Sequence, residues 1–444
     1  MMTRFLTRRL DQPFSRSSVR STPTHPRGAA KLAETTQGVA SVEEAVEDLE
    51  RRLARYPEDR YPVQHATAHF HLGLALTHAG RLRDAERPLR ESMRIFRDVD
   101  LIAESAKAAT ALGSVCRISG RLAEAQDLFS RAVAGFDAAG LRAELGAAQF
   151  DCGLVQRERG DVNGALGSFR EATRLLSANS AQGQAASREL GTTLMLTGGA
   201  ESAVEVLERS LSLARERDDS EAVGATANVL GLAYIGAGRF DEAVGALELA
   251  ARAHPRSVRP AGYAMAKANL ALAHERAGDN PRSRLAAAQA LSVEAAPDPV
   301  KAQASAVLDR LGPGRADLLR TLERESTDRW PMLFREELPR WAAVDRDERR
   351  LAACDWIEAI VQTERANELA EQWLGALLEL PPEQMECVIE AVVEALADTP
   401  PEIGEGFRAT VAGSTHRFHL PQATRLQKTF ETIAAEHGGP TRWS

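Results

Sequence analysis

Apolar and small residues recur at helical spacing through the middle of this chain, and glycines interrupt them at nearly constant intervals. Each glycine follows an apolar run, such as residues 72–76 or 230–234, and in most units it precedes an alanine with a bulky apolar residue four positions later. Apolar residues at i and i+4 share one face of a helix, so each interval predicts a helix, a tight turn and a second helix. The six glycines are Gly80, Gly120, Gly160, Gly198, Gly238 and Gly278.

Further positions repeat in register with these glycines. Seven residues before each turn the chain has a glycine or an alanine, and the residue before that one is apolar. Small residues let two helices approach closely, so the pattern predicts an array of packed helix pairs. The small residues before the turns are Gly73, Gly113, Gly153, Gly191, Gly231 and Ala271, and those five residues after the turns are Ala85, Ala125, Ala165, Ala203, Ala243 and Ser283.

The alternation of small and bulky positions over residues 61–294 resembles the tetratricopeptide repeat, whose motif places Leu-Gly in the first helix and Ala, Phe and Ala in the second. The chain departs from the family in its period, which is about 40 residues rather than about 34. The proline that often ends the second helix survives only as Pro255. The resemblance implies an all-α fold, a right-handed superhelical solenoid of about six and a half repeats, and a role in binding proteins.

The repeat pattern continues on both sides of the segment that contains the six glycines. Ala45 and Leu49 precede Ala85 and Leu89 by one full period, which predicts a lone second helix from Ser41 as a cap at the front. At the rear, Pro297 opens a helix that we expect to end near residue 311 and to cover the last apolar face.

Composition changes after the Gly-Pro-Gly sequence at 312–314, because all five tryptophans follow it. Helical periodicity continues over 315–326, 329–342, 346–379 and 382–398, and Pro421 opens a final helix. The apolar stripe from Trp356 to Leu377 is expected on one long helix, packed inside this region or against a partner. Four parts are therefore predicted: a disordered Arg/Ser/Pro-rich arm at 1–38, the array at 39–311, a Trp-containing helical domain at 315–398, and a C-terminal extension with a final helix at 399–444.

The net charge of −8 argues against binding of nucleic acid by the protein as a whole. The first 31 residues are locally basic, as an unstructured arm or a transit peptide would be. Four distant cysteines give no metal spacing or disulfide framework, and no apolar stretch reaches the roughly 20 residues of a membrane span. Together with abundant Arg and Ala, these features favour a cytoplasmic, bacterial protein, and homo-oligomerisation stays open.

In the repeat family the first helices line a concave groove, and the resemblance assigns groove positions by their offset from the small residue of each first helix. These positions carry four cations and one acid, Glu158, which favours an acidic peptide or a terminal carboxylate as ligand. In the alternative, the arginines pair with glutamates on neighbouring helices. The family's carboxylate clamp of lysine and asparagine is not matched. The candidate groove residues are Lys107, Thr110, Ser114, Arg117, Phe150, Arg157, Arg188, Thr192 and Asn228.

Candidate chemistry is sparse elsewhere. His65 and His69 lie one turn apart on a predicted helix, and His71 and His78 two turns apart, but neither pair has a visible third metal ligand. His416 and His419 fall in a predicted loop or short strand. No phosphate-binding loop, nucleophile elbow, dinucleotide fingerprint or zinc-protease helix is present in the sequence. We therefore expect no catalytic residue, no cofactor and no resident metal.

The favoured hypothesis is an interaction scaffold or regulatory adaptor that binds a protein or peptide partner, without direct contact to nucleic acid. One alternative is an enzyme whose catalytic domain lies in 315–444 and whose repeats recruit the substrate. Another is the sensor module of a bacterial signalling or transcription-regulatory system.

Overall fold

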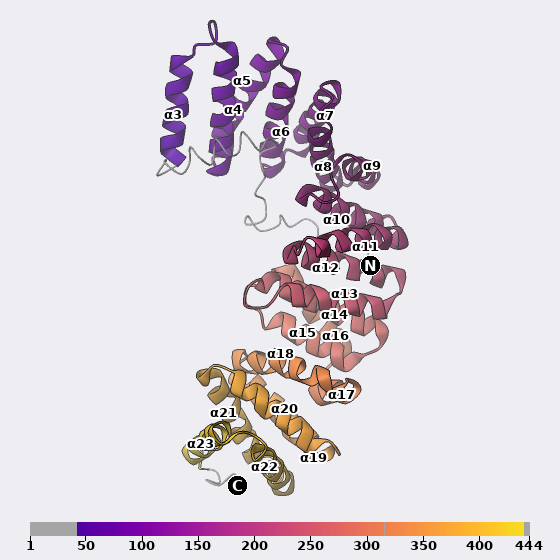
Figure 1. Ribbon diagram of the computed structural model, residues 1–444, viewed down its shortest axis with the longest axis vertical. Helices are drawn as coiled ribbons and strands as arrows, with labels where there is room; N and C mark the ends of the chain where they lie inside the picture. The colour runs from indigo at the N-terminus through magenta and orange to yellow at the C-terminus, as the bar shows by residue number, and fades with distance from the viewer. Residues whose placement is uncertain (1–41, 315, 439–444) are drawn as a thin grey trace. The chain divides into compact units, whose positions relative to one another are not determined.

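The computed structural model describes residues 42–314 and 316–438, and the predicted arm at 1–38 lies outside them. Every regular element in the described residues is a helix (Figure 1). The chain divides into two compact units, residues 1–237 and 238–444. None of the described helices combines the length and apolar character needed to cross a membrane.

The first unit repeats one motif, two antiparallel helices joined by a tight turn. A lone helix precedes the first pair, and neighbouring helices along the chain pack against one another. The elements are α3 (Val42–Arg55), α4 (Pro62–His78), α5 (Leu82–Asp98), α6 (Ile102–Ile118), α7 (Leu122–Ala138), α8 (Arg142–Glu158), α9 (Val162–Leu175), α10 (Ala181–Leu196), α11 (Ala200–Glu216) and α12 (Ser220–Ala237).

The glycine intervals of the sequence correspond to the turns between helices. All six repeating glycines have positive φ, from 74° at Gly80 to 85° at Gly160. A side chain with a Cβ is strained in this left-handed conformation, so the turn requires glycine. The predicted helix-turn-helix repeat is confirmed.

The small positions of the first helices are explained by the second helices. A Cβ on Gly113 would lie 2.9 Å from the ring of Phe129, and one on Gly153 would lie 2.8 Å from the ring of Phe169. Both rings are fully buried. The glycine is needed because the aromatic side chain of the paired helix fills the space beside it.

The second unit continues the helix order and then changes character. Its elements are α13 (Phe240–Ala253), α14 (Pro260–Ala277), α15 (Asn280–Leu291), α16 (Asp298–Leu311), α17 (Asp317–Arg324), the 3-10 helix η1 (Thr327–Arg329), α18 (Trp330–Ala343), α19 (Arg346–Gln362), α20 (Ala366–Glu379), α21 (Pro382–Asp398), α22 (Pro401–Thr415) and α23 (Leu420–Glu436).

The tryptophans of the described residues form the centre of one apolar core. Trp356 packs edge-to-face on Phe334 with ring centroids 5.6 Å apart, and Trp373 lies 6.1 Å from Trp356. The expected stripe is buried within this core, as the packing interpretation predicted. Leu285 of α15 belongs to the same core, so α15 shares it with the helices after residue 314, α17 to α23, which we call the tryptophan helices.

Two predictions about helix bounds are wrong. The expected single helix over 346–379 is two helices, because Thr363 leaves the helical conformation with φ −92° and ψ 143°. Helix α22 was missed, because Pro400 and Pro401 were interpreted as a helix end, whereas Pro401 is the first residue of a new helix. Proline suits that position because it has no N–H to leave unpaired.

Composition and packing give different divisions of the chain. The compact units meet at residues 237 and 238, inside the repeats, whereas the tryptophan content changes after 312–314. The domain bounds taken from composition therefore stay a proposal.

Candidate functional site

All nine predicted groove residues lie in the first unit, on the first helices α6, α8, α10 and α12. At one end, Lys107 pairs with Glu104 at 3.5 Å. The hydroxyls of Thr110 and Ser114 donate to backbone carbonyls of their own helix at 3.0 and 3.1 Å. The two hydroxyls are therefore partly used inside α6.

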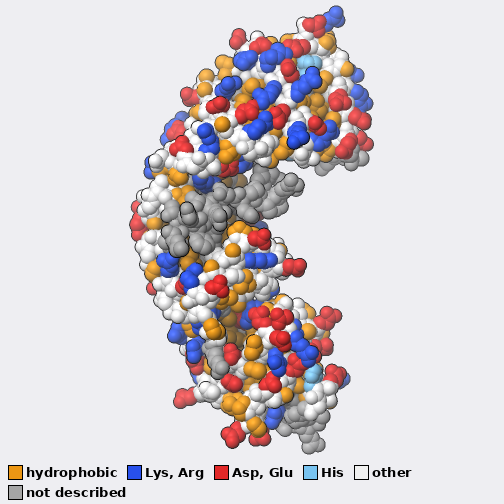
Figure 2. All heavy atoms as spheres, turned by 180° about the vertical axis from the view of Figure 1, so that it is seen from behind, with side chains coloured by type: hydrophobic (Ala, Val, Ile, Leu, Met, Phe, Trp, Pro, Cys, Tyr) orange, Lys and Arg blue, Asp and Glu red, His pale blue; other side chains and the backbone are white. Residues whose placement is uncertain are grey.

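Two of the predicted arginines connect neighbouring first helices. Arg117 of α6 donates to Glu158 of α8 at 2.8 Å. Arg157 of α8 pairs with Glu189 of α10, and its guanidinium lies 5.6 Å from the ring centre of Phe169. These contacts are the pairing that the sequence left open as the alternative to ligand binding. Within each unit, cationic and acidic side chains lie interspersed on the face drawn in Figure 2.

Phe150 packs against Phe169, the aromatic ring that Arg157 also contacts. Its ring centre lies 5.9 Å from that of Phe169, and it packs against Ala172, Leu176 and Ala186. Phe150 is therefore half-buried and contributes to packing, as well as being a predicted groove position.

Arg188 on α10 differs from the other groove cations. Its guanidinium has no hydrogen bond or ion pair within the part of the chain that the structure describes. Burial lowers the pKa of Arg188, while the carboxylates of Glu189, Asp219 and Glu221 raise it. Arg188 is therefore a partly buried cation that a ligand carboxylate could pair with.

The remaining two predicted residues are buried. Thr192 is 7% exposed and donates to the carbonyl of Arg188 at 2.9 Å. Asn228 is also 7% exposed and already has a partner. Both offer less to a ligand than the sequence suggests.

Sequence reasoning missed Asp151, on α8 beside Arg117. Burial raises the pKa of Asp151 to about 6, and the charge of Arg117 opposes that rise. The offset that assigns groove positions skips this residue. Its type, an acid between Phe150 and Cys152 on an otherwise apolar stretch, was the available signal.

The histidine-rich helix α4 does not assemble a three-ligand site among the described residues. His65 Nδ1 lies 2.7 Å from the carbonyl oxygen of Tyr56, and the rings of His65 and His69 are 4.8 Å apart, edge to face. Burial, with the neighbouring His65, lowers the pKa of His69. These imidazoles act in packing.

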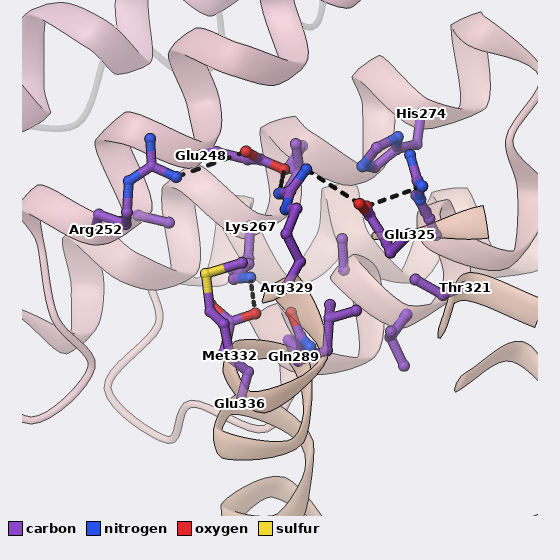
Figure 3. Close-up of a pocket in the computed structure, with 16 residues that line it drawn as sticks. Glu248, Arg252, Lys267, His274, Gln289, Thr321, Glu325, Arg329, Met332 and Glu336 are labelled. Atoms are coloured by element: carbon purple, nitrogen blue, oxygen red, sulfur yellow. Dashed lines mark hydrogen bonds and ion pairs between the residues drawn. The ribbon is translucent and has the colours of Figure 1, made fainter. Parts of the chain in front are cut away.

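A closely packed polar region lies in the second unit between α13, α14, α15, α17 and α18 (Figure 3). Lys267 of α14, 6% exposed, donates to Glu336 of α18 at 2.7 Å. The buried amide of Gln289 on α15 donates to Glu337 of α18, which also accepts from Arg340. The space enclosed is only about 50 Å³. It has room for water and no larger ligand.

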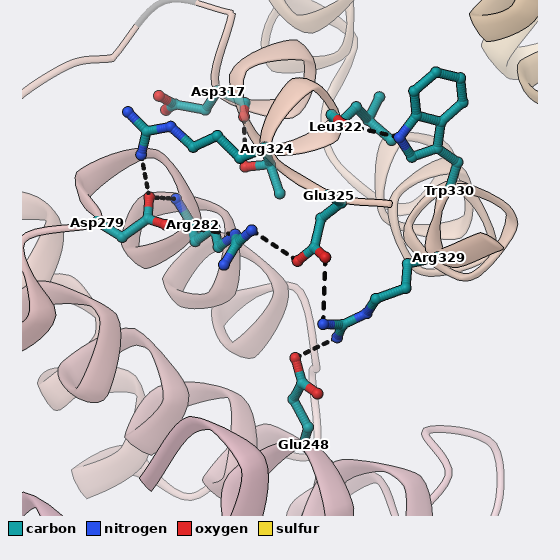
Figure 4. A network of polar contacts seen from close by, with 10 residues as sticks. Glu248, Asp279, Arg282, Asp317, Leu322, Arg324, Glu325, Arg329 and Trp330 are labelled. Atoms are coloured by element: carbon teal, nitrogen blue, oxygen red, sulfur yellow. Dashed lines mark hydrogen bonds and ion pairs between the residues drawn. The ribbon is translucent and has the colours of Figure 1, made fainter. Parts of the chain in front are cut away.

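An ion-pair network extends from this region along α17 and η1 (Figure 4). Glu325 accepts from Arg282 at 2.8 Å and from Arg329 at 3.3 Å, and Arg329 continues to Glu248. Arg324 pairs with Asp279 at 3.0 Å. The residues after 312–314 are thus fixed to the last repeat helices by charge as well as by apolar packing.

The tryptophan helices carry one open hollow of about 670 Å³, bordered by α19, α21, α22 and α23. Arg346 pairs there with Glu394, and Arg350 donates to Asp398 at 2.6 Å. At its edge Glu390, Glu394 and His437 bring possible metal-ligand atoms within 4.8 Å of one another. Sequence reasoning missed this group because His437 lies on a different helix end, far from the glutamates along the chain.

The comparisons with known proteins agree with the geometry. One tetratricopeptide repeat model matches residues 183–256, and a second matches 228–299. A search of the curated proteins gave no match.

Solved structures from several organisms match part of the chain. The nearly identical TPR-like repeats of a putative kinesin light chain of Podosopora anserina are 20% identical, with 45% of this chain and 99% of that chain covered and a TM-score of 0.39. PilF of Pseudomonas aeruginosa is 18% identical, with 59% and 97% covered and a TM-score of 0.39. A tetratricopeptide repeat protein of Parabacteroides merdae is 12% identical, with 63% and 96% covered and a TM-score of 0.43.

The motif of small and bulky positions, the glycine turns at positive φ and the two family models therefore agree. Residues 183–299 of this chain therefore match tetratricopeptide repeats, within an all-α repeat fold.

Proposed function

We propose that this protein is an interaction scaffold or adaptor, and that the groove along α6, α8, α10 and α12 binds a peptide or protein segment with an acidic group. Repeats of this kind supply an extended binding surface built from successive first helices. In the first unit, four first helices carry the candidate residues. These helices alternate with the second helices along the chain.

The observation that carries the proposal is Arg188. Arg188 is partly buried and its guanidinium has no partner among the described residues, so a carboxylate that reaches it gains a charge-assisted hydrogen bond. A bidentate arginine–carboxylate contact also fixes the direction of the bound segment.

The paired arginines have a different role in this proposal. Arg117 and Arg157 are held by Glu158 and Glu189, so a ligand would have to displace an existing partner to use them. Together with these glutamates, the two arginines instead line the proposed groove with alternating hydrogen-bond donors and acceptors. The segment that fits carries an acidic residue for Arg188, flanked by uncharged residues that can hydrogen-bond to these side chains.

A peptide display selection tests this proposal. A random library is selected on the full chain and, in parallel, on Arg188→Glu. We expect peptides enriched in Asp, Glu or a free C-terminal carboxylate from the wild type, and loss of that enrichment with the variant. Enrichment of the same peptides on both proteins would contradict the role given to Arg188.

One observation favours a second function, an enzyme or small-molecule sensor in the tryptophan helices. The hollow of about 670 Å³ beside Arg346 has the size of small-ligand sites. Binding of a metabolite that survives truncation of the first unit, and is lost with Arg408→Ala at the hollow, would support it.

A further inference from the structure

The second and fourth repeats place different chemistry at equivalent positions. In the second repeat, small apolar side chains from α6, α7 and α8 pack with one aromatic ring in a separate core cluster. The equivalent positions two repeats later belong to α10, α11 and α12, which also pack against one another. The cluster Ala106, Ala109, Ala132, Phe136 and Ala148 corresponds to Gln184, Ser187, Ser210, Ala214 and Thr226.

Four of the five positions in the fourth repeat thus carry a polar side chain. Gln184, Ser210 and Thr226 are 1%, 3% and 0% exposed. The ring of Phe136 corresponds to the smaller methyl group of Ala214. The interior between α10, α11 and α12 is therefore polar where the equivalent interior of the second repeat is apolar.

Three of these four polar side chains have no hydrogen-bond partner among the described residues. Both the oxygen and the nitrogen of the Gln184 amide lack a hydrogen bond, as do the hydroxyls of Ser210 and Thr226. Helical hydroxyls can donate to their own backbone, as Ser187 and Thr193 do here. The amide of Gln184 needs both a donor and an acceptor from elsewhere, so it carries the argument.

Leaving such groups unpaired in the interior is costly, about 1–3 kcal/mol for each group, and native proteins meet that demand with protein partners or ordered water. We infer that Gln184, Ser210 and Thr226 form a buried hydration site that binds one or more water molecules between α10, α11 and α12. A neutral site with both donors and acceptors, closed to solvent, fits water better than an ion. Because α10 and α12 also carry Arg188 and Asn228, the bound water lies between helices that supply the groove wall.

The test detects water at the Gln184 amide directly. Deuterated full-length protein with 15N-labelled glutamine is examined for nuclear Overhauser effects between side-chain amide protons and long-lived water. Gln303 is the matched control, since it is 7% exposed but its amide donates to the backbone carbonyl of Ala268 and the side-chain oxygen of Asn269 within the protein. We expect a water signal at Gln184 and none at Gln303. Absence of the signal at Gln184 would overturn the inference.

Two further measurements distinguish bound water from hydrogen-bond partners within the protein and from a bound small molecule. The variant Gln184→Met/Ser210→Ala/Thr226→Val keeps the volume but removes the polar groups, so we expect it to lose the water signal and to unfold at a higher urea concentration. A lower midpoint would show that the polar groups already have partners within the protein. Native mass spectrometry of the wild type should show no retained compound, and a bound small molecule would overturn the assignment to water.

Discussion

Lys267 on α14 and Glu336 on α18 form an ion pair of 2.7 Å whose lysine is 6% exposed, although the two residues are 69 positions apart in the chain. The ammonium group also lies 5.4 Å from the ring centre of Tyr263. In the preceding repeat the position equivalent to Lys267 is the fully buried Ala227. A buried cation is tolerated in the last repeat because α18 brings the carboxylate that neutralises it.

The first prediction separates the charge of this pair from its packing. Glu336→Ala leaves Lys267 buried without its counter-ion, so we expect a loss of about 3 kcal/mol in the free energy of unfolding. Lys267→Met/Glu336→Ala removes both charges and should be nearer the wild type than the single variant. Urea unfolding at pH 7 measures both. A double variant less stable than Glu336→Ala would contradict the explanation.

The second prediction concerns pH and His274. Burial lowers the pKa of His274 from 6.5 to about 4. Above pH 6.5 the imidazole is neutral in both states, whereas between 6.5 and 4 the unfolded chain binds a proton that the folded protein does not. Stability is therefore lost as the pH falls through this window, by about 2.5 kcal/mol at pH 4.5.

The variant His274→Gln checks this, because glutamine occupies the equivalent position 156. Unfolding free energies of wild type and variant are compared at pH 7.5 and 4.5. The wild type should lose more stability over this range than the variant. Equal losses would show that folding does not lower the pKa of His274.

The third prediction concerns truncation at the compositional boundary. A fragment of residues 1–312 lacks α17 and α18, and so exposes Leu285, Lys267 and Gln289. We expect its helices α13–α16 to exchange amide hydrogens much faster than in the full chain, while α4–α11 keep their protection. Mass-spectrometric hydrogen exchange measures this, and unchanged protection of α13–α16 would contradict the shared core.

The sequence predicts those features of the structure that depend on residues close together in the chain, and fails for contacts between residues far apart in it. The helix pairs were predictable because Gly113 and Phe129, or Gly153 and Phe169, are local partners repeated at one period. The turn at Thr363 was not, because it contains no glycine or proline, and the hydroxyl that accepts from the Arg365 N–H at 3.4 Å marks it only in three dimensions.

The groove shows the same limit. The offset from the small residue of each first helix predicted Arg117, Arg157 and Arg188 equally as groove residues. Which of them has a carboxylate partner depends on the packing of neighbouring helices. Long-range pairs such as Lys267 with Glu336 follow no period and could not be read from the sequence.

The fourth prediction uses the difference in ion pairing between Arg157 and Arg188. Arg157 is 11% exposed, pairs with Glu189 and lies against Phe169, so Arg157→Glu places two carboxylates together and should destabilise the protein by about 2–4 kcal/mol. Arg188→Gln breaks no ion pair and adds no carboxylate beside Glu189, Asp219 and Glu221, so it should cost clearly less. Thermal unfolding of the two variants compares them, and equal destabilisation would contradict the contacts assigned to Arg157.

The most direct test of the proposed groove is the affinity of a selected acidic peptide for three proteins, measured by fluorescence anisotropy at constant salt. The control is Arg209→Glu, an exposed position on the second helix α11 that changes net charge equally. The proposal predicts that Arg188→Glu weakens binding by about tenfold or more, as expected for a charge-assisted hydrogen bond of about 1.5–3 kcal/mol, while Arg209→Glu changes it little. Equal affinity of Arg188→Glu and the wild type, with both folded, would contradict it.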